Sequence, residues 1–420
     1  MNILVVNGYV RQNKGDAALM SVICHELQRT FTAASIKISS QEDPSELPYF
    51  EEWQNIGSFN RYCFSPAKSK VHRLCRTLLS SAAIILCACL PRKAANFMLP
   101  LLPRSLRRIF GALLSADLVV AMGGGYLNGD RSMMANVCVF FMLAPLKLAK
   151  RFGACAVCAP QSMGPFATRF QRLVVAHTLE QIDLLLTRER KTDKLLAAVS
   201  KKIQLTPAVD SGFLFHSAKT ADLRQKLHIT PGQLVVGITV RRWLDAKRQQ
   251  HYEAAIAHTV DYLVEQHQAA VVIIPQVTSN LGGDDDRVTA RHVYAHIRHT
   301  KQVHILTDDY SHHAIKTLYN ALDMIIGTRF HSVIFSLTSL VPALAIEYEH
   351  KTSGIMHDLG LDDWVVKIEE ASAEILQPKV DKLVASRQQY KKHLKKVLPA
   401  YVEKAKQATT QIEQVYAQYG

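Results

Sequence analysis

Two basic side chains, Arg329 and His331, lie within the segment Gly-Thr-Arg-Phe-His-Ser at residues 327–332. An apolar run at 322–326, typical of a buried parallel strand, precedes this segment, and a helix-like stretch at 333–340 follows it. In open α/β sheets, ligands bind outside the carboxyl ends of the strands, where helix N-termini favour anions. Arginine offers a planar pair of donors, and histidine offers a proton near neutral pH. We therefore predict an anion site; the alternative is that Arg329 pairs with a carboxylate and His331 caps the helix.

A second guanidinium follows another predicted strand in the same half of the chain. Arg241 comes directly after the apolar run at 235–240, and Arg242 should point the opposite way because side chains alternate along a strand. We predict that Arg241 is the second anion ligand. The acidic run at residues 284–286 could hold a divalent metal, but adjacent aspartates at a helix start are more often capping residues, so we expect no metal site.

The first half of the chain offers polar side chains after its strands. Asn13 and Asp16 open a helix after the first strand, where Asp16 could serve simply as a cap. Three glycines at 123–125 leave backbone open to a ligand, so Gly124 and Gly125 are predicted to line the site together with Asn128. Asp130 follows as a candidate base for a sugar hydroxyl. Its alternative role is to cap the helix at 133–148.

Three further segments supply candidate ligand-binding side chains. Gln161 begins the turn Gln-Ser-Met-Gly-Pro-Phe at 161–166, and Arg188 lies in Thr-Arg-Glu after the next strand. In the second half, Glu349, His350 and Lys351 follow an apolar run at 343–346. Each segment is predicted to come after a strand end and therefore to reach the same edge of its sheet.

Strand-like and helix-like segments alternate along most of the chain, which is the pattern of parallel sheets covered by helices. The fold class is therefore α/β. We expect strands at residues 3–6, 118–121, 154–159, 184–186 and 203–205, and then at 235–240, 270–274, 303–306, 324–326 and 343–346. The length of 420 residues favours two Rossmann-like domains. Their predicted ranges are 1–218, with a basic, apolar helical insertion at about 68–114, and 219–420, with a helical tail and with the linker around 217–231.

The composition favours an anionic partner. The formal net charge is +14, from 50 Lys and Arg against 36 Asp and Glu. Aromatic residues do not interleave with basic ones as base stacking requires, so no nucleic acid is expected. The basic, apolar residues 68–114 could contact an anionic membrane peripherally or could form core-packing helices. The N-terminal sequence lacks the pattern of a signal peptide, which predicts a cytoplasmic protein.

The eight cysteines do not resemble a disulfide framework. Cys24, Cys75, Cys87, Cys89 and Cys138 lie in apolar, helix-like segments, so we expect reduced thiols in the core. Cys155 and Cys158 form a C-x-x-C pair, but they lie in a strand-like segment without a second pair, so we expect neither a metal site nor a redox role there.

Taken in order and spacing, these segments resemble the polysaccharide pyruvyl transferase family over about residues 1–365, with 68–114 the least similar part. The segments are Asn13-Lys-Gly-Asp16, Gly123-Gly-Gly125 with Asp130, Gln161 to Phe166, Thr187-Arg-Glu189, Gly327 to Ser332 and Glu347 to Lys351. The resemblance implies a fold similar to two-domain GT-B glycosyltransferases, with Rossmann-like domains that face a cleft. It implies the acceptor on the first domain and phosphoenolpyruvate on the second.

The resemblance also implies an activity and its residues. Pyruvate would pass from phosphoenolpyruvate to two hydroxyls of one sugar, forming a ketal and releasing phosphate, with no cofactor beyond this co-substrate. Arg241, Arg329 and His331 would contact phosphoenolpyruvate, and Asp130 would be the catalytic carboxylate. Apart from the resemblance, the chemistry of ketal formation needs a proton donor, which could be His331 or His350. The acceptor would be a polysaccharide or its lipid-linked precursor. Two other interpretations compete: a GT-B glycosyltransferase that uses a nucleotide sugar, and a polyanion-binding protein without turnover.

Overall fold

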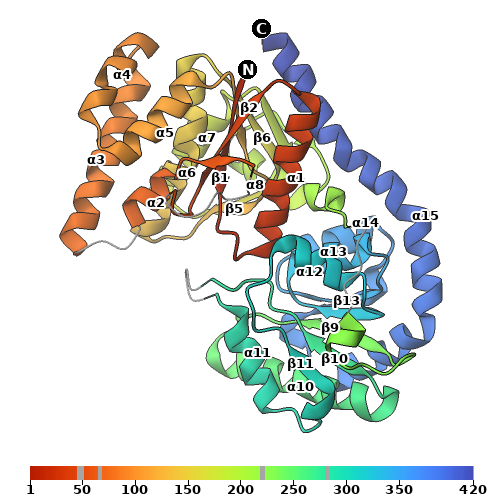
Figure 1. Cartoon of the computed structure of the whole chain (residues 1–420). Coiled ribbons are helices and arrows are strands. Elements are labelled where there is room, and N and C mark those ends of the chain that lie inside the picture. The colour runs from red at the N-terminus through yellow and green to blue at the C-terminus, as the bar shows by residue number, and fades with distance from the viewer. Residues whose placement is uncertain (45–51, 65–68, 218–222, 280–283, 420) are drawn as a thin grey trace. The chain divides into compact units, whose positions relative to one another are not determined.

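The structure is a computed structural model of the chain, and it describes residues 1–44, 52–64, 69–217, 223–279 and 284–419. The chain folds as two compact units. The first comprises Met1–Val10, Leu19–Ser211 and the C-terminal segment from Lys404, and the second comprises Arg11–Ala18 and Gly212–Glu403. Each unit is a parallel sheet covered by helices, as the α/β pattern predicts (Figure 1).

The sheet of the first unit has eight strands in the order β3-β2-β1-β4-β6-β7-β8, with β5 paired to β6. The strands are β1 (Asn2–Gly8), β2 (Ser35–Ser40), β3 (Gln54–Asn55), β4 (Leu118–Ala121), β5 (Gly124–Gly129), β6 (Cys155–Phe166), β7 (Leu184–Thr187) and β8 (Thr206–Pro207). The helices are α1 (Lys14–Thr30), α2 (Phe59–Phe64), α3 (Lys70–Cys89), α4 (Arg92–Met98), α5 (Arg104–Ser115), α6 (Met133–Phe152), α7 (Arg169–Leu179) and α8 (Arg190–Val199), with the 3-10 turn η1 (Leu99–Leu101). A second 3-10 turn, η2 (Ser211–Leu214), has only Ser211 in this unit.

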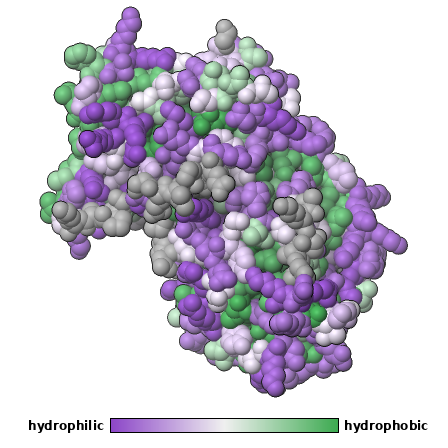
Figure 2. Space-filling model, viewed as in Figure 1, coloured by the Kyte–Doolittle hydropathy of each residue, from purple (hydrophilic) through white to green (hydrophobic). Residues whose placement is uncertain are grey.

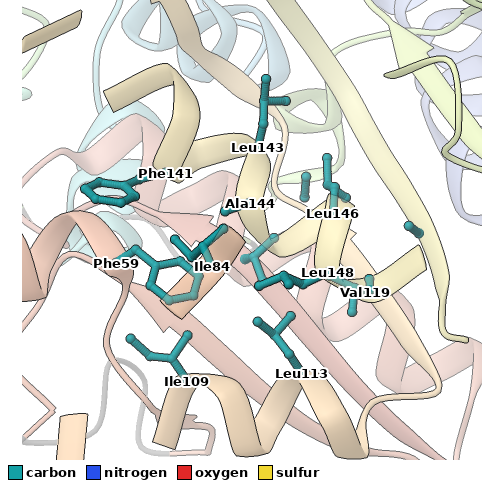
Figure 3. Close-up of a cluster of buried hydrophobic side chains, with 14 of the residues drawn as sticks. Phe59, Ile84, Ile109, Leu113, Val119, Phe141, Leu143, Ala144, Leu146 and Leu148 are labelled. Atoms are coloured by element: carbon teal, nitrogen blue, oxygen red, sulfur yellow. The ribbon is translucent and has the colours of Figure 1, made fainter. Parts of the chain in front are cut away.

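Alternation along β1 divides the core of the first unit into two layers. Leu4 and Val6 point into one layer, and Ile3 and Val5 point into the other. The first layer packs the sheet against α2, α3, α5 and α6, as the side chains of Figure 3 show. The second packs it against α1 and the end of the C-terminal helix. Both faces of the strands are therefore apolar, which is why they appear in the sequence as continuous hydrophobic runs.

The sheet of the second unit has six parallel strands in the order β11-β10-β9-β12-β13-β14. They are β9 (Val235–Thr239), β10 (Ala270–Ile273), β11 (Val303–Ile305), β12 (Met324–Gly327), β13 (Ala343–Glu347) and β14 (Val365–Lys367). The helices are α9 (Leu223–Lys226), α10 (Ala246–His267), α11 (Asp286–Ala295), α12 (His312–Tyr319), α13 (Phe330–Thr338), α14 (Lys351–Asp358) and α15 (Ala373–Tyr419), with 3-10 turns η4 (Thr300–Gln302), η5 (Asp362–Trp364) and η6 (Ile368–Glu370).

Several predicted elements differ from the structure. Residues 203–205 are not a strand; the short strand β8 follows them instead. The segment from Gln161 to Phe166 is not a turn but the second half of β6, and the residues after Gly123 form β5. Strands β2, β3 and β14 were not predicted. They are short edge or near-edge strands, and two of them have only two or three residues, which leaves little periodicity to detect.

The predicted ranges and the structural units also differ at two places. The tail was assigned to the second domain, but α15 crosses into the first unit from Lys404, because Ala408 and Ile412 are buried against the first sheet. The segment from Arg11 to Ala18, which includes the start of α1, belongs to the second unit. Of the predicted linker, residues 218–222 lie outside the described part of the chain, as does Lys68 of the predicted insertion.

The prediction of buried cysteines holds for Cys24 and Cys87, whereas Cys138 is half-buried; Cys155 and Cys158 of β6 are buried as well. It is wrong for Cys75 and Cys89, which are exposed. Both lie on α3, and Cys87 of the same helix is buried, so α3 turns one apolar face inward and another outward. Apolar composition alone does not distinguish these two faces.

Candidate active site

Most of the predicted site residues of the second unit follow the carboxyl ends of neighbouring strands. Arg241 follows β9, Arg329 and His331 follow β12, and Glu349 to Lys351 follow β13. Strands β9, β12 and β13 are adjacent and parallel. Their carboxyl ends therefore bring side chains from three distant segments to one edge of the sheet, where ligands of open α/β sheets bind.

Arg329 is buried at the start of α13 and is held by two carboxylates. Its Nε donates to both oxygens of Asp286 at 3.1 Å, and its Nη2 donates to Asp286 at 2.5 Å. Nη1 and Nη2 also donate to Asp284 at 3.0 and 2.7 Å. Burial alone would lower the pKa of Arg329, but the charges and hydrogen bonds of Asp286 and Asp284 outweigh it and raise the pKa. The guanidinium is therefore a permanent cation with most of its donors in use.

The two partners of Arg329 differ in how firmly they are held. The Asp286 side chain is 1% exposed and also accepts the backbone N–H groups of Gln276 and Val277 at 3.0 and 2.9 Å. Burial raises the pKa of Asp286, while Arg329 and the hydrogen bond from Val277 act in the opposite direction. The Asp284 side chain is 37% exposed. Asp286 is thus a fixed anchor, and Asp284 is an accessible partner.

Arg241 lies between two aromatic rings. Its guanidinium carbon is 4.6 Å from the ring centre of Trp243 and 4.0 Å from that of Tyr348. The same guanidinium is 3.7 Å from Asp284, whereas Arg242 is exposed. The predicted alternation of Arg241 and Arg242 therefore agrees with their burial. The sequence analysis did not predict these two rings. Trp243 nevertheless stands two residues after Arg241, and Tyr348 lies within the segment from Glu347 to Lys351.

The loop that contains Asn13 packs against this edge of the second sheet. Asn13 forms an antiparallel bridge with Val277, and the Lys14 N–H donates to the carbonyl of Gln276 at 2.9 Å. Gly15 lies against the ring of His331: a Cβ at this position would stand 2.2 Å from His331 Nδ1. A side chain there would collide with the ring, so glycine is required for this close approach.

Asn13, rather than Asp16, caps the helix that follows. The Asn13 side chain accepts the Asp16 N–H at 3.3 Å and donates to the Asp16 carboxylate at 2.7 Å. The alternative role proposed for Asp16 is thus filled by Asn13, because the helix begins at Lys14 and Asp16 already lies inside its first turn. Both residues lie in the segment that belongs to the second unit.

Lys14 is a buried cation that sequence reasoning did not select. It is 2% exposed, and its Nζ lies 2.5 Å from Asp309, which also accepts a hydrogen bond from Thr278 at 2.6 Å. Burial lowers the pKa of Lys14, and the hydrogen bond and charge of Asp309 act against this shift. Lysines are rarely buried without a specific partner, and Asp309 is that partner here, 295 residues away in the sequence, so the local sequence holds no signal for it.

The side chains that follow β13 are more exposed than Arg241 and Arg329. Glu349 and His350 are exposed, and the Nζ of Lys351 lies 2.7 Å from the Glu349 carboxylate. The Lys351 ammonium also lies 5.3 and 5.5 Å from the ring centres of Phe330 and Tyr348. Lys351 therefore adds positive charge beside the aromatic rings that hold Arg241.

Asp130 lies in the first unit and is exposed. Its side chain accepts the backbone N–H of Ser132 at 2.7 Å, and hydrogen bonds from Ser132 lower the pKa of Asp130. The N-cap of α6 is Ser132, whose side chain accepts the N–H of Ala135. Asp130 is therefore not the helix cap that was its alternative role. It is an accessible, ionised carboxylate just after β5.

The other predicted residues of the first unit lie in or beside its sheet. Gly124 pairs with Gln161, and Asn128 donates to the carbonyl of Gly125 at 3.0 Å. Gln161 is fully buried, and its Oε1 has no hydrogen-bond partner among the described residues. Arg188 forms a buried ion pair with Asp210 and donates to Ser162 at 2.7 Å. The Gln161 Oε1 can therefore still accept a hydrogen bond. The ion pair of Arg188 with Asp210 holds the residues at the carboxyl ends of the strands in place.

A pocket of the first unit also opens at the ends of β1 and β2. Asn60 of α2 lines it, and its buried Oδ1 has no hydrogen-bond partner among the described residues. The other lining residues are Asn7, Gly8, Tyr9, Ser39, Gln41, Ser58, Phe59, Tyr126, Phe141, Met142 and Pro145. In the described part of the chain, no group of three or more His, Cys, Asp or Glu side chains is arranged to hold a metal ion.

Two solved structures illustrate the similarity of the fold. Sucrose-phosphate synthase from Thermosynechococcus elongatus matches with a TM-score of 0.61 and 12% identity, over 100% of this chain and 98% of that one. UDP-GlcNAc 2-epimerase from Neisseria meningitidis matches with a TM-score of 0.60 and 11% identity, over all of both chains. At such low identity these matches show the fold alone, which is that of the GT-B glycosyltransferases and related epimerases.

Sequence comparison identifies the family. The chain is 22% identical over 377 residues to the amylovoran biosynthesis protein AmsJ of Erwinia amylovora, covering 86% of this chain and 87% of AmsJ. The family model for polysaccharide pyruvyl transferase matches residues 13–350, which include all the predicted site residues except Lys351. With a match of this extent, the chain belongs to the polysaccharide pyruvyl transferase family.

Proposed function

We propose that the protein transfers pyruvate from phosphoenolpyruvate to two hydroxyls of a sugar in a cell-surface or extracellular polysaccharide, or in its lipid-linked precursor. The products are a cyclic ketal and inorganic phosphate, and the reaction takes place in the cytoplasm. Family membership supports pyruvylation of a polysaccharide. The identity of the donor is argued from the charges at the edge of the second sheet.

One observation carries the assignment of the donor: two guanidiniums from adjacent strands approach the same accessible carboxylate. Arg329 binds Asp284 through two nitrogens at 3.0 and 2.7 Å, and Arg241 lies 3.7 Å from it. A position between two guanidiniums stabilises any anion that enters it. Phosphoenolpyruvate carries a carboxylate and a phosphate on three carbons, so it offers two anions to such a pair.

Asp284 is the residue that phosphoenolpyruvate would displace. Four N–H directions of Arg329 are used by Asp286 and Asp284 together, so the guanidinium can grip a substrate with two donors only if one carboxylate leaves. Asp286 is the costly one to remove, because it is 1% exposed and holds two backbone N–H groups. We therefore assign Asp286 to positioning Arg329, and Asp284 to occupying the anion position until substrate binds.

Formation of the ketal then requires proton transfers and the departure of phosphate. In the proposed sequence, Asp130 accepts the proton of the first sugar hydroxyl as its oxygen bonds to C2 of phosphoenolpyruvate, and C3 gains a proton, which we assign to His331. The second hydroxyl then bonds to C2, the bond from C2 to the phosphate oxygen breaks, and the phosphate leaves with the second proton. Arg241, Arg329 and Lys351 stabilise the negative charge on the departing phosphate.

The experiment is a donor assay with the purified protein. Phosphoenolpyruvate and a panel of lipid-linked and nucleotide-linked sugars are incubated with it, and phosphate release and the mass of the sugar product are followed. Pyruvylation predicts phosphate release that depends on both substrates. Release of a nucleotide from a nucleotide sugar, without consumption of phosphoenolpyruvate, would instead identify a glycosyltransferase.

A matched pair of variants tests the anion site within that assay. Arg241→Lys keeps the charge but loses the planar fork and the stacking between two rings, so the KM for phosphoenolpyruvate should rise at least tenfold. Arg242→Lys is the control, because Arg242 is the next residue and is exposed. An equal effect of both substitutions would contradict the assignment of Arg241.

A further inference from the structure

Helix α3 presents an apolar face to the outside of the first unit. Val71, Leu74, Leu78 and Ile85 are 70%, 58%, 60% and 57% exposed. Their spacing of three, four and seven residues places them on one side of the helix. Leu79 and Leu86 are exposed beside this stripe, and in the following residues Phe97 and Leu101 are exposed as well. Figure 2 shows hydrophobic surface over α3 and α4.

The opposite face of α3 is part of the protein core. Ser80, Ala83, Ile84 and Cys87 are buried, and Ile84 packs among side chains of α2, α5 and α6 (Figure 3). By length and composition α3 could cross a membrane, as could α6 among the described helices. A spanning α3, however, would have to withdraw its buried face from the first core. Its exposed face alone is available to a partner.

The stretch of sequence that contains this face carries charge of one sign. Residues 53–116 contain no Asp or Glu, but they contain ten Lys and Arg. Lys70 and Arg73 lie on α3 itself, and both are exposed. The exposed basic side chains that follow are Arg92, Lys93, Arg104, Arg107 and Arg108. A partner for this surface must therefore offer an apolar layer bordered by negative charge, which describes the headgroup region of an anionic bilayer.

We propose that the exposed face of α3 is a docking surface for an anionic lipid membrane, with its leucines and isoleucine inserted among the acyl chains and its lysines and arginines at the headgroups. A second copy of the chain fits this surface poorly, because it would bring the same acid-free, basic region against itself. Within the basic, apolar residues 68–114, for which a membrane contact was predicted, the contact is thereby assigned to α3 and not to α5. The apolar side of α5 is buried, since Leu106, Ile109, Phe110 and Leu113 belong to the core.

The inference concerns where the enzyme works, and it stands apart from the identity of the donor. A protein held at the membrane surface would meet a lipid-linked sugar by diffusion in two dimensions, which fits the lipid-linked form of the proposed acceptor. Docking can be measured without any substrate. Its failure would therefore leave the proposed pyruvyl transfer untouched, and failure of the transfer assay would leave docking untouched.

The test is sedimentation of the full-length protein with vesicles of phosphatidylcholine alone or of phosphatidylcholine mixed with phosphatidylglycerol. We expect at least tenfold stronger binding to the mixed vesicles, weakening as salt is raised because part of the attraction is screened. The triple variant Leu74→Ser, Leu78→Ser, Ile85→Ser should bind at least tenfold more weakly. It should still fold, because all three side chains are largely exposed.

Two controls make the result specific. The triple variant Leu173→Ser, Val288→Ser, Ile375→Ser removes as many exposed apolar side chains from elsewhere, so it should bind vesicles like the wild type. The double variant Lys70→Gln, Arg73→Gln removes two basic side chains from α3. Its control is Lys201→Gln, Lys202→Gln, which removes two basic side chains from elsewhere; all four side chains are exposed.

Three outcomes would overturn the proposal: no binding of the wild type to mixed vesicles at low salt, equal loss in the α3 and control triples, or equal binding to both kinds of vesicle. A dimer by light scattering that becomes monomeric only in the α3 triple would assign the face to a second copy instead.

Discussion

Because Arg329 is paired with Asp284, one substitution in this site should raise the affinity for substrate, whereas most active-site substitutions lower it. Asp284→Asn should tighten the binding of phosphoenolpyruvate. The amide keeps the size of the side chain but removes the negative charge that now faces Arg329 and lies 3.7 Å from Arg241. The substrate would then enter a site with two cations and one fewer competing anion.

The size of the gain in affinity follows from the interactions between Asp284 and Arg329 that phosphoenolpyruvate must displace. Asp284 accepts two hydrogen bonds from a charged donor, at 3.0 and 2.7 Å. Such bonds are worth about 1.5–3 kcal/mol each when buried, whereas exposed ion pairs are worth about 0–1 kcal/mol. With 37% of the Asp284 side chain exposed, the pair lies between these cases. A total of about 1–2 kcal/mol gives a Kd that is about 5–30 times lower.

The assay is calorimetric titration of phosphoenolpyruvate into the purified protein at fixed ionic strength. Asp285→Asn is the matched control: it removes the same charge from the next residue, which caps α11 and pairs with Arg287 instead. Its Kd should stay near the wild-type value. A Kd for Asp284→Asn that is unchanged or higher would refute the reasoning and would make Asp284 part of the binding site itself.

Three further substitutions probe the rest of the site. Arg329→Lys should abolish phosphoenolpyruvate-dependent phosphate release. It should also lower the free energy of unfolding by about 2–3 kcal/mol, because the buried Asp286 loses the planar guanidinium that binds it. An unchanged free energy of unfolding in denaturant would contradict the importance of this buried pair. Gly15→Ala should reduce kcat/KM by about 100-fold by displacing the His331 ring, with the circular dichroism spectrum unchanged, and full activity would show that the ring has room to move. Asp130→Asn should lower kcat by about 100- to 10,000-fold while the Kd of phosphoenolpyruvate stays constant; a native rate would remove Asp130 as the base.

Much of the fold could be predicted from the sequence because periodicity is a local property. The central strands β1, β4, β9, β10 and β12 are buried on both faces, so each appears as an unbroken apolar run. The parallel order of strands then follows from their alternation with helices. The short strands β3 and β14 lack such a run, and β5 is rich in glycine, so local pattern did not reveal them.

The sequence also determined which side chains reach the ligand edge of the second sheet. Arg241, Arg329 and His331 stand directly after strands, and a strand's carboxyl end fixes where the next residues go. Sequence spacing likewise distinguished Arg241 from Arg242, because side chains alternate along an extended chain.

Only the tertiary structure decided what those side chains contact. Asp284 and Asp286 precede Arg329 by 45 and 43 residues, and nothing in their local pattern separates an ion-pair partner from a helix cap. Gly15 and His331 are further apart still, yet the ring lies against the glycine. The same holds for α3, which has apolar side chains on two faces of opposite exposure. Contacts of this kind depend on how distant segments pack, and periodicity along one segment carries no information about its neighbour in space.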